Sequence, residues 1–367
     1  MTDHGAGPDR LSYGAFRAGG EPARLGARRG DRIVDLSALG PLDGVPGDVL
    51  VAPVLNPLLE AGPSAWAALD AALADVEPTL DVAEVEPVLP MAVADYVDFY
   101  SSLHHAANVG RMFRPDADPL PRNWRHLPVG YHGRSGTVVV SGTPVRRPRG
   151  QLPGPDGPRF GPTERLDFEL ELGAVIGVPS SGPVPVERAL EHVFGLVLLN
   201  DWSARDIQAW EYQPLGPFLA KSFATSIGAW ISPLADLRAC RVPGAAHEPP
   251  PLDYQREDPW AFDLDLEVEL QGTVVTRSSA RHLYWSLAQQ IAHLTCNGAT
   301  LRVGDLLASG TVSGPEPHER GCLLELSWNG TEPLRLADGS ERAWLQDGDE
   351  VVMRGTGLAE VSGRIEP

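Results

Sequence analysis

Four carboxylates from three separate segments are the residues of this sequence whose types and spacing point most directly to chemistry. They are Asp98, Glu169, Glu171 and Asp201. Hard divalent cations such as Mg²⁺ and Ca²⁺ bind oxygen ligands, and acids gathered from several segments supply them. We therefore predict an oxygen-ligated Mg²⁺ or Ca²⁺ site, and Mn²⁺ accepts the same ligands.

A histidine pair follows the first of these acids. His104 and His105 lie in the segment 98–114, where Ser101 or Ser102 can cap the start of a helix. In a helix successive side chains point about 100° apart, so only one of the two histidines readily faces a given pocket. Taken alone, the segment also has the pattern of a capped helix with two surface histidines.

A second set of polar residues follows Asp201. Arg205, Gln208 and Tyr212 are spaced i, i+3 and i+7, so they share one face of a helix just beyond that acid. An apolar stripe is more typical of those positions in a structural helix. Lys221, the single lysine of the chain, follows nine residues later, which suggests a particular role in a protein otherwise supplied with arginine.

Two candidates lie in the last quarter of the chain. The segment 305–314 resembles a strand with a small-residue loop at Thr311, where a ligand or a backbone can approach closely. Glu325 interrupts the apolar run 322–328, which we interpret as a strand. A carboxylate there is either exposed on an edge or buried with a partner, and a histidine can be that partner.

Strand patterns would bring the acids together. Asp167, Glu169 and Glu171 alternate with apolar residues, so a strand would place all three on one face. A solvated outer face is the usual explanation of such a pattern. Like charges on one face repel, however, and the strand continues into the apolar residues 174–176, which favours a cleft and a bound cation.

A second strand and a helix would position the acid of the following segment. The apolar run 196–199 leads to Asp201 at the end of a strand. Ser203 and Asp206 have the spacing of a capping box, which predicts the start of the next helix.

Composition limits the class of protein and its partners. The 367 residues carry 49 Asp and Glu against 30 Lys and Arg, a net charge of -19, which opposes binding to nucleic acid or to anionic membranes. The three cysteines are far apart and form neither a disulfide framework nor a metal pair, so a reducing cytoplasm is expected. The apolar runs are too short to span a bilayer. We expect a cytoplasmic protein with a small-molecule substrate.

Turn residues and periodicity suggest how the chain is organised. Residues 11–55 alternate short β-prone pieces with turns, and Ser64 precedes an amphipathic helix that packs on them. The proline-rich segment 76–90 reads as a linker. Residues 115–161 read as a long functional loop in which Arg134 could hold an anion.

Motifs in chain order carry a resemblance to a known family. They are D-F-Y-S-S, N-W-R-H-L-P-V-G-Y-H-G-R, V-V-V-S-G-T-P, L-D-F-E-L-E, N-D-W-S-A-R-D-I-Q-A-W-E-Y, P-L-G-P-F-L-A-K-S-F and D-L-L-A-S-G-T-V-S-G. Across most of residues 95–330 the sequence resembles the fumarylacetoacetase family. S-Y-G-A-F and D-R-I-V-D-L-S are similar to the smaller domain of that family.

The resemblance implies a fold and a set of site residues. The fold would be mainly β with α/β elements: an SH3-like barrel and linker in residues 1–90, and a mixed β-roll catalytic domain in residues 91–367, assembled as a homodimer. His105 would be the catalytic histidine, with Glu325 as its partner. The resemblance also implies oxyanion stabilisation by Arg205, Gln208 and Lys221, metal ligation by Asp98, Glu169, Glu171 and Asp201, and substrate contacts by Tyr100, Arg114, Tyr131, Tyr212 and Thr311.

The implied reaction is metal-dependent hydrolysis of a carbon–carbon bond in 4-fumarylacetoacetate, which gives fumarate and acetoacetate in the last step of tyrosine and phenylalanine catabolism. One alternative is a related acylpyruvate or diketo-acid hydrolase, or a decarboxylase-isomerase of aromatic catabolism, which shares the metal acids. Another is a non-catalytic, metal-stabilised binding protein. His105 together with Glu325, and the presence of the N-terminal domain, favour the hydrolase.

Overall fold

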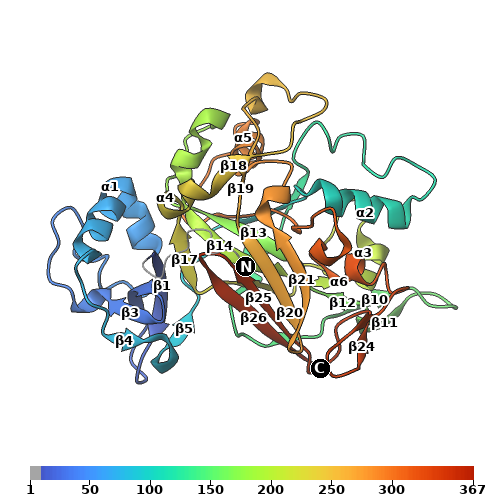
Figure 1. The fold of residues 1–367 in the computed structure, drawn as a ribbon, viewed down its shortest axis with the longest axis horizontal. Helices are drawn as coiled ribbons and strands as arrows, with labels where there is room; N and C mark the ends of the chain where they lie inside the picture. The colour runs from blue at the N-terminus through green and yellow to red at the C-terminus, as the bar shows by residue number, and fades with distance from the viewer. Residues whose placement is uncertain (1–9) are drawn as a thin grey trace.

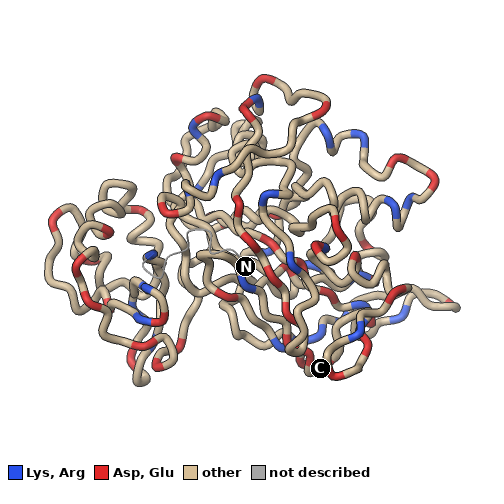
Figure 2. The backbone as a smooth tube through the Cα atoms, in the orientation of Figure 1, with Lys and Arg blue, Asp and Glu red and all other residues tan. Residues whose placement is uncertain are grey.

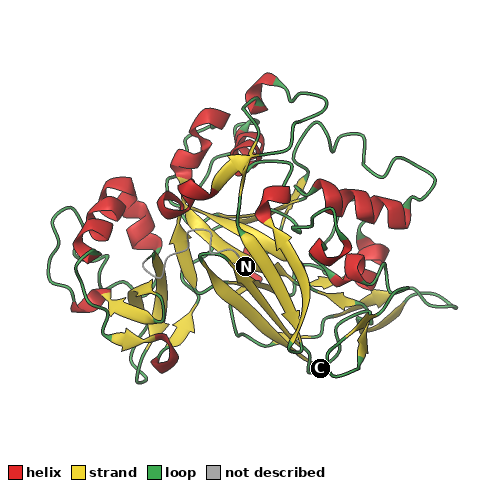
Figure 3. Cartoon of the chain, in the orientation of Figure 1, coloured by secondary structure: helices red, strands yellow, loops and turns green. Residues whose placement is uncertain are grey.

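The computed structural model describes residues 10–367. Two large β-sheets occupy the middle of the molecule, and short helices lie around their margins (Figures 1 and 3). The helices are α1 (Asn56–Leu73), α2 (Leu103–Phe113), α3 (Arg205–Glu211), α4 (Leu234–Leu237), α5 (Leu287–Thr295) and α6 (Leu323–Leu326). The fold is therefore mainly β with added helices, as predicted.

The N-terminal unit is a small antiparallel sheet covered by α1. Its strands are β1 (Leu11–Arg17), β2 (Arg24–Arg29), β3 (Arg32–Asp35), β4 (Leu80–Asp81) and β5 (Glu86–Val88). The predicted linker, residues 76–90, is in fact part of this unit, because β4 pairs with β3 and β5 pairs with β1. Prolines do not prevent this pairing, since short edge strands tolerate them.

The central sheet continues from the N-terminal unit through the pairing of β1 with β17. Beyond β1 its order is β17 (Trp230–Pro233), β14 (Val193–Asp201), β13 (Leu170–Ile176), β22 (Leu306–Ala308), β6 (Tyr96–Phe99) and β7 (Gly130–His132). Two further strands, β16 (Thr225–Ile227) and β8 (Val138–Val140), join it at β14. The sheet thus brings residues from distant parts of the sequence side by side.

Strand β14 is apolar on both faces because each face is covered. Leu196 and Leu198 belong to the core against the second sheet, whereas Val197 and Leu199 belong to the core shared with the N-terminal unit. Alternate side chains of a strand point to opposite faces, so a strand covered on both sides is apolar at successive positions, here up to Asn200 and Asp201 at its end. The run 196–199 therefore forms the strand that the sequence predicted.

The second sheet packs across β14 and closes one core. Its order is β21 (Thr273–Ser279), β20 (Asp265–Leu270), β25 (Glu350–Gly355), β26 (Leu358–Glu366) and β9 (Val145–Arg146). The turn between β20 and β21 falls at Gln271 and Gly272, both with positive φ. Four two-stranded ribbons complete the fold: β10 (Arg149–Leu152) with β11 (Arg159–Pro162), β12 (Leu166–Asp167) with β15 (Ser203–Ala204), β18 (Arg241–Pro243) with β19 (Trp260–Phe262), and β23 (Leu334–Arg335) with β24 (Glu341–Arg342).

The segment 322–328 begins with a short helix, α6, so the predicted strand is wrong. The backbone N–H groups of Leu323 and Leu324 donate to the carboxylate of Asp167, at 2.7 and 3.0 Å. The first N–H groups of a helix lack partners within it, and a carboxylate placed there stabilises the turn. The acceptor comes from a distant strand, which local periodicity does not reveal.

Two further local predictions need correction. Helix α3 begins after Ala204 without a side-chain cap, so Ser203 and Asp206 do not form a capping box. Ser203 lies in β15, which pairs with β12, and Asp206 accepts a hydrogen bond from the N–H of Glu164 at 2.7 Å. The predicted loop, residues 115–161, carries β7, β8, β9, β10 and the start of β11. Short strands of two to four residues explain why the segment lacked a clear period.

Acidic residues are spread along the chain, over both the N-terminal unit and the larger sheets (Figure 2). No helix within residues 10–367 is long and apolar enough to cross a membrane. Helix α5 begins with a capping box formed by Ser286 and Gln289. It closes one end of the core between the sheets.

Candidate active site

Three strands deliver acids to the same face of the central sheet. Glu171 on β13 and Asp201 on β14 have the parity of Val175 and Leu199, which face the N-terminal core, and Asp98 on β6 has the parity of Tyr96. Glu169 lies just before β13. One carboxylate oxygen from each of these four residues, here called the four-acid cluster, lies within 4.8 Å of the others. The sequence prediction that these acids meet is confirmed.

The cluster is buried and short of partners, which fits a hard divalent cation. Burial first, and then repulsion from neighbouring carboxylates, raises the pKa of Asp98 and of Glu171 well above their ordinary values. Asp98 Oδ1 and Glu171 Oε1 are buried without a hydrogen-bond partner among the described residues. Buried carboxylates are otherwise paired or bound to metal, so these oxygens are suitable ligands for an oxygen-seeking cation.

Two basic side chains neutralise the other half of the cluster. Lys221 Nζ contacts Glu169 and lies 2.7 Å from Asp201 Oδ2, and Arg205 Nη2 lies 2.7 Å from Glu169 Oε1. Burial alone would raise the pKa of Glu169, but the charges of Lys221 and Arg205 lower it well below its ordinary value. The nearby carboxylates in turn raise the pKa of Lys221 against the effect of burial, so its ammonium stays charged.

Helix α2 places one histidine inside and one outside. Ser102 caps the helix by accepting from the N–H of His105, at 3.2 Å. His105 is only 3 % exposed, and its Nδ1 lies 2.5 Å from Glu325 Oε2. His104 points to another surface and packs edge-on against His282. The two histidines therefore face different neighbours, as expected for adjacent positions of a helix.

The carboxylate of Glu325 is saturated with hydrogen bonds. Besides His105, Ser313 Oγ donates to Oε2 at 2.7 Å, and Asn108 Nδ2 donates to Oε1 at 2.9 Å. Burial acts to raise the pKa of Glu325, but His105 and these donors together lower it to about 2. The carboxylate is therefore ionised and fixed in orientation behind the His105 ring.

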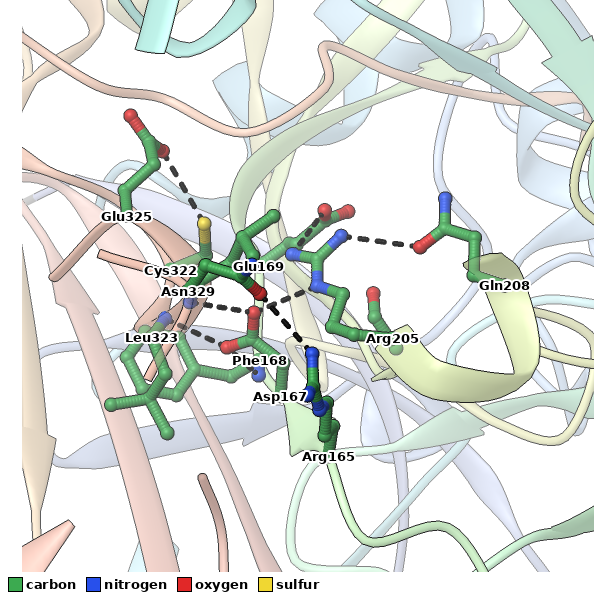
Figure 4. Close-up of polar contacts among 12 residues, drawn as sticks. Arg165, Asp167, Phe168, Glu169, Arg205, Gln208, Cys322, Leu323, Glu325 and Asn329 are labelled. Carbon is green, nitrogen blue, oxygen red and sulfur yellow. Dashed lines mark hydrogen bonds and ion pairs between the residues drawn. The ribbon is translucent and has the colours of Figure 1, made fainter. Parts of the chain in front are cut away.

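The remaining predicted donors lie beside the cluster. Arg205 Nη1 approaches Gln208 Oε1 at 3.4 Å, so these two residues of α3 share one face as predicted (Figure 4). With Lys221 they form the donor group. Gln208 is half-buried, whereas Lys221 is 6 % exposed. Arg205 and Lys221 thus contact acids of the cluster directly, and Gln208 is linked to it through Arg205.

Of the five predicted substrate contacts, three lie beside the four-acid cluster or His105 and two lie at the periphery. Tyr131 donates to Asp201 Oδ2 at 3.0 Å, and Tyr100 packs edge-on against the His105 ring. Thr311 is buried, and its hydroxyl has no partner among the described residues, so it remains free for a ligand. These three residues therefore border the site.

Arg114 and Tyr212 lie at the periphery. The Arg114 guanidinium is exposed and donates to the carbonyl of Pro119, and Tyr212, 48 % exposed at the end of α3, accepts from Gln213. Among the described residues, none of the hydrogen bonds of either residue reaches the four-acid cluster. Both would have to move, or a ligand would have to extend outward, for contact.

An open cleft leads to the site. It has a volume of about 480 Å³ and is lined by Tyr131, Arg134, Phe218, Lys221 and Ser222, among others. Tyr131 and Lys221 belong to both the cleft and the surroundings of the four-acid cluster. The cleft therefore gives solvent access from the donor-group side.

Sequence reasoning missed two residues and misplaced a third. Asn108 and Ser313 hold Glu325, and the i, i+3 spacing of Asn108 from His105 was a signal that both face one way. Asp167 was expected beside Glu169 and Glu171 on one strand face. It pairs instead with Arg205 Nε at 2.8 Å, because the strand is interrupted between β12 and β13.

Comparisons with known proteins show which family the chain resembles. Residues 95–366 match the family model described as "Fumarylacetoacetate (FAA) hydrolase C-terminal". The chain is 44% identical to a fumarylacetoacetase from Bos taurus and 43% identical to one from Homo sapiens, and in each case the match covers 97% of this chain and 95% of the relative. A fumarylacetoacetase from Arabidopsis thaliana is 43% identical, with 97% and 94% covered.

Solved structures share the fold. A fumarylacetoacetate hydrolase from psychrophilic Exiguobacterium antarcticum superposes with a TM-score of 0.61 at 18% identity, covering 97% of this chain and 99% of that one. A putative HpcE protein from Mycobacterium smegmatis gives a TM-score of 0.61 at 22% identity, covering 96% and 98%. The solved structures show the fold, whereas the family model and the sequence relatives show the family. The chain belongs to the fumarylacetoacetate hydrolase family.

Proposed function

We propose that this chain hydrolyses a carbon–carbon bond of 4-fumarylacetoacetate and releases fumarate and acetoacetate, the last step of tyrosine and phenylalanine catabolism. The observation that carries the proposal is the arrangement of a buried histidine–carboxylate pair and three donors around four acids within 4.8 Å of one another. Curated relatives named fumarylacetoacetase, matched over 97% of the chain, support the choice of substrate.

His105 acts as the general base. Glu325 accepts at Nδ1, which leaves Nε2 of the ring to take a proton from water. The water oxygen then attacks the keto carbon of the fumaroyl group. The ionised Glu325 stabilises the imidazolium that forms, and such a positioned base contributes about a hundred- to ten-thousandfold in rate.

The donor group meets the negative charge that develops on the keto oxygen. Arg205 and Lys221 are held by buried acids, so their donors are fixed before the reaction begins. Fixed donors in a water-poor site stabilise an oxyanion strongly, and removal of one costs about a hundred- to thousandfold. When the carbon–carbon bond breaks, the electron pair passes to the acetoacetate fragment as an enolate, which takes a proton from the His105 imidazolium.

The four-acid cluster would hold Mg²⁺ or Ca²⁺ through Asp98, Glu169, Glu171 and Asp201, and the unpartnered oxygens of Asp98 and Glu171 support this assignment. When bound, the cation supplies Lewis-acid stabilisation of the enolate. The chain's own contribution is to gather the acids on one sheet face and to keep Lys221 charged beside them. Thr311, Tyr100, Tyr131, Arg114 and Tyr212 are the proposed substrate contacts.

We propose three further properties, which concern domains, assembly and location. The five antiparallel strands β1–β5 form an SH3-like barrel within residues 1–90, and residues 91–367 form the catalytic domain. The chain acts as a homodimer, for which the exposed apolar side chains of Leu215 and Phe218 offer surface. A cytoplasmic location suits the three free cysteines.

The proposal is tested by following the ultraviolet absorbance of the conjugated diketone. Metal-stripped protein is mixed with fumarylacetoacetate before and after addition of Mg²⁺ or Ca²⁺, with an acylpyruvate as the comparison substrate. We expect cation-dependent loss of absorbance with fumarylacetoacetate and much slower loss with the acylpyruvate. No turnover of fumarylacetoacetate with either ion would overturn the assignment, and faster turnover of the acylpyruvate would move it to that substrate class.

A further inference from the structure

Asp167 is a buried acid that takes no part in the four-acid cluster. Its side chain is fully buried, and its two oxygens accept four hydrogen bonds (Figure 4). Oδ2 accepts from Arg205 Nε at 2.8 Å and from the N–H of Leu324 at 3.0 Å. Oδ1 accepts from the N–H of Leu323 at 2.7 Å and from that of Phe168 at 2.8 Å.

Two of these bonds fix the helix that carries Glu325. Helix α6 is only four residues long, and the side chain of its cap residue, Cys322, does not bond to its free N–H groups. Asp167, 156 residues earlier, accepts from the first two of them. A helix of one turn has almost no stability of its own, so an acceptor at its start holds it in place.

The other partner of Asp167 belongs to the donor group. Arg205 donates from Nε to Asp167, and its Nη2, which makes no hydrogen bond, lies 2.7 Å from Glu169 Oε1 as an ion pair. Two acids on different edges restrict the rotation of the planar guanidinium, which orients the remaining nitrogen, Nη1. Figure 4 shows that nitrogen directed towards Gln208, on the side of the donor group.

We propose that Asp167 is a positioning residue that holds Arg205 and the Glu325 helix at a fixed distance from each other. The inference rests on the proposed function, in which Arg205 meets the oxyanion and Glu325 orients the base. One carboxylate bonded to both elements keeps the base and the oxyanion donor in register across the substrate. A helix cap with no catalytic consequence is the competing explanation.

The test is a double-mutant cycle that separates these explanations. Asp167→Asn keeps the volume of the side chain but removes its charge and half of its acceptor capacity. We expect kcat to fall about ten- to hundredfold, as for other residues that orient active-site groups, while KM changes less than about threefold. In an Arg205→Lys background, where no Nε–H reaches Asp167, the same substitution should lower kcat much less than in the wild type.

Asp206→Asn is the matched control. Asp206 is also a carboxylate on α3 that accepts backbone and hydroxyl hydrogen bonds, from Glu164 N and Thr163 Oγ1, but among the described residues none of its hydrogen bonds comes from a proposed catalytic residue. The kcat of the Asp206→Asn protein should stay within about twofold of the wild-type value. An Asp167→Asn protein that folds and keeps the wild-type kcat overturns the proposal, and so does a loss that is equally large in the Arg205→Lys background.

Hydrogen exchange of the wild-type protein gives a readout that needs neither activity nor a folded variant. The amides of Leu323 and Leu324 should be strongly protected, because they donate to a buried carboxylate, whereas first-turn amides of a short surface helix exchange quickly. Rapid exchange at both amides would overturn the inference. Failure of the wild type to turn over fumarylacetoacetate, with these amides protected, would instead overturn the proposed function.

Discussion

The four-acid cluster and the His105–Glu325 pair are both buried, yet their hydrogen bonding differs. Glu325 receives hydrogen bonds on both oxygens and has a pKa of about 2. In the cluster, oxygens of Asp98 and Glu171 lack partners, and burial with mutual repulsion raises the pKa of each acid. The pair is complete with protein atoms alone, whereas the cluster requires a cation to balance its charge.

This difference in hydrogen bonding shows which part of the site is complete without a ligand. A pair that is already satisfied keeps its geometry through the reaction, which suits a base that must accept and return a proton. A cluster with unsatisfied oxygens is destabilising on its own and gains stability when a ligand binds. Replacement of Asp98 or Glu171, the two acids with unpartnered oxygens, should therefore act on stability in the opposite direction from replacement of the groups around Glu325.

The largest expected effect is that of Glu171→Gln. Loss of this ligand should abolish cation-dependent turnover, because the amide carries no charge for the ion. At neutral pH and in the presence of a chelator the variant should nevertheless be more stable than the wild type, because burial and the neighbouring carboxylates raise the pKa of Glu171 and so disfavour its ionised form in the fold. Turnover and thermal unfolding in chelator measure the two effects.

Glu187→Gln controls for the loss of one negative charge, since Glu187 is exposed and lies outside the site. It should leave both turnover and the melting temperature unchanged. A Glu171→Gln protein less stable than the wild type in chelator would contradict the idea that the cluster is internally strained.

The next effect concerns acid stability. The pKa of Glu325 falls from an ordinary value of 4.5 to about 2 on folding, so its stabilisation is fully present above about pH 4.5 and is lost as the pH falls towards 2. Two to three pKa units correspond to roughly 3 kcal/mol. Glu325→Gln should lack this contribution, so the wild-type advantage in free energy of unfolding should shrink between pH 5 and pH 2, in urea titrations at each pH. A constant difference across that range would count against a depressed pKa.

A smaller effect is expected for Asn108→Ala, which removes the donor to Glu325 Oε1. The buried oxygen loses its single side-chain partner from α2, which should cost about 1 to 2 kcal/mol in unfolding free energy. The activity should fall about tenfold, because Glu325 can turn behind His105. Chemical denaturation and steady-state kinetics measure the two, and Val109→Ala, at a half-buried position next along α2, is the control. Equal losses in the two variants would mean that Asn108 acts only by packing.

Much of this site was predictable because its residues occupy regular positions. The parity of strands β13 and β14 and the end of an apolar run placed Glu171 and Asp201, and helical spacing separated His105 from His104. The family motifs linked these residues to a shared pocket before any distance was known. Regular elements transmit sequence periodicity directly into geometry, so such inferences hold.

The parts that could not be predicted depend on contacts between distant segments. The helix at Glu325 exists because Asp167 caps it from another ribbon, and the short strands within residues 76–90 and 115–161 exist because partner strands lie beside them. The sequence around each of these segments carries no periodic signal. Hydrogen bonds between distant segments therefore determine the structure where the local sequence pattern gives no signal.

The most direct test of the account is to compare His105→Ala with His104→Ala in both cation binding and turnover. Mg²⁺ or Ca²⁺ is titrated into each metal-stripped protein by calorimetry, and fumarylacetoacetate hydrolysis is then measured. We predict that His105→Ala binds the cation within about threefold of the wild type while kcat falls at least about a hundredfold, and that His104→Ala matches the wild type in both. Retained turnover in His105→Ala, or turnover and cation binding lost together, would contradict the division of the site into a proton-transfer pair and a separate cation-binding cluster.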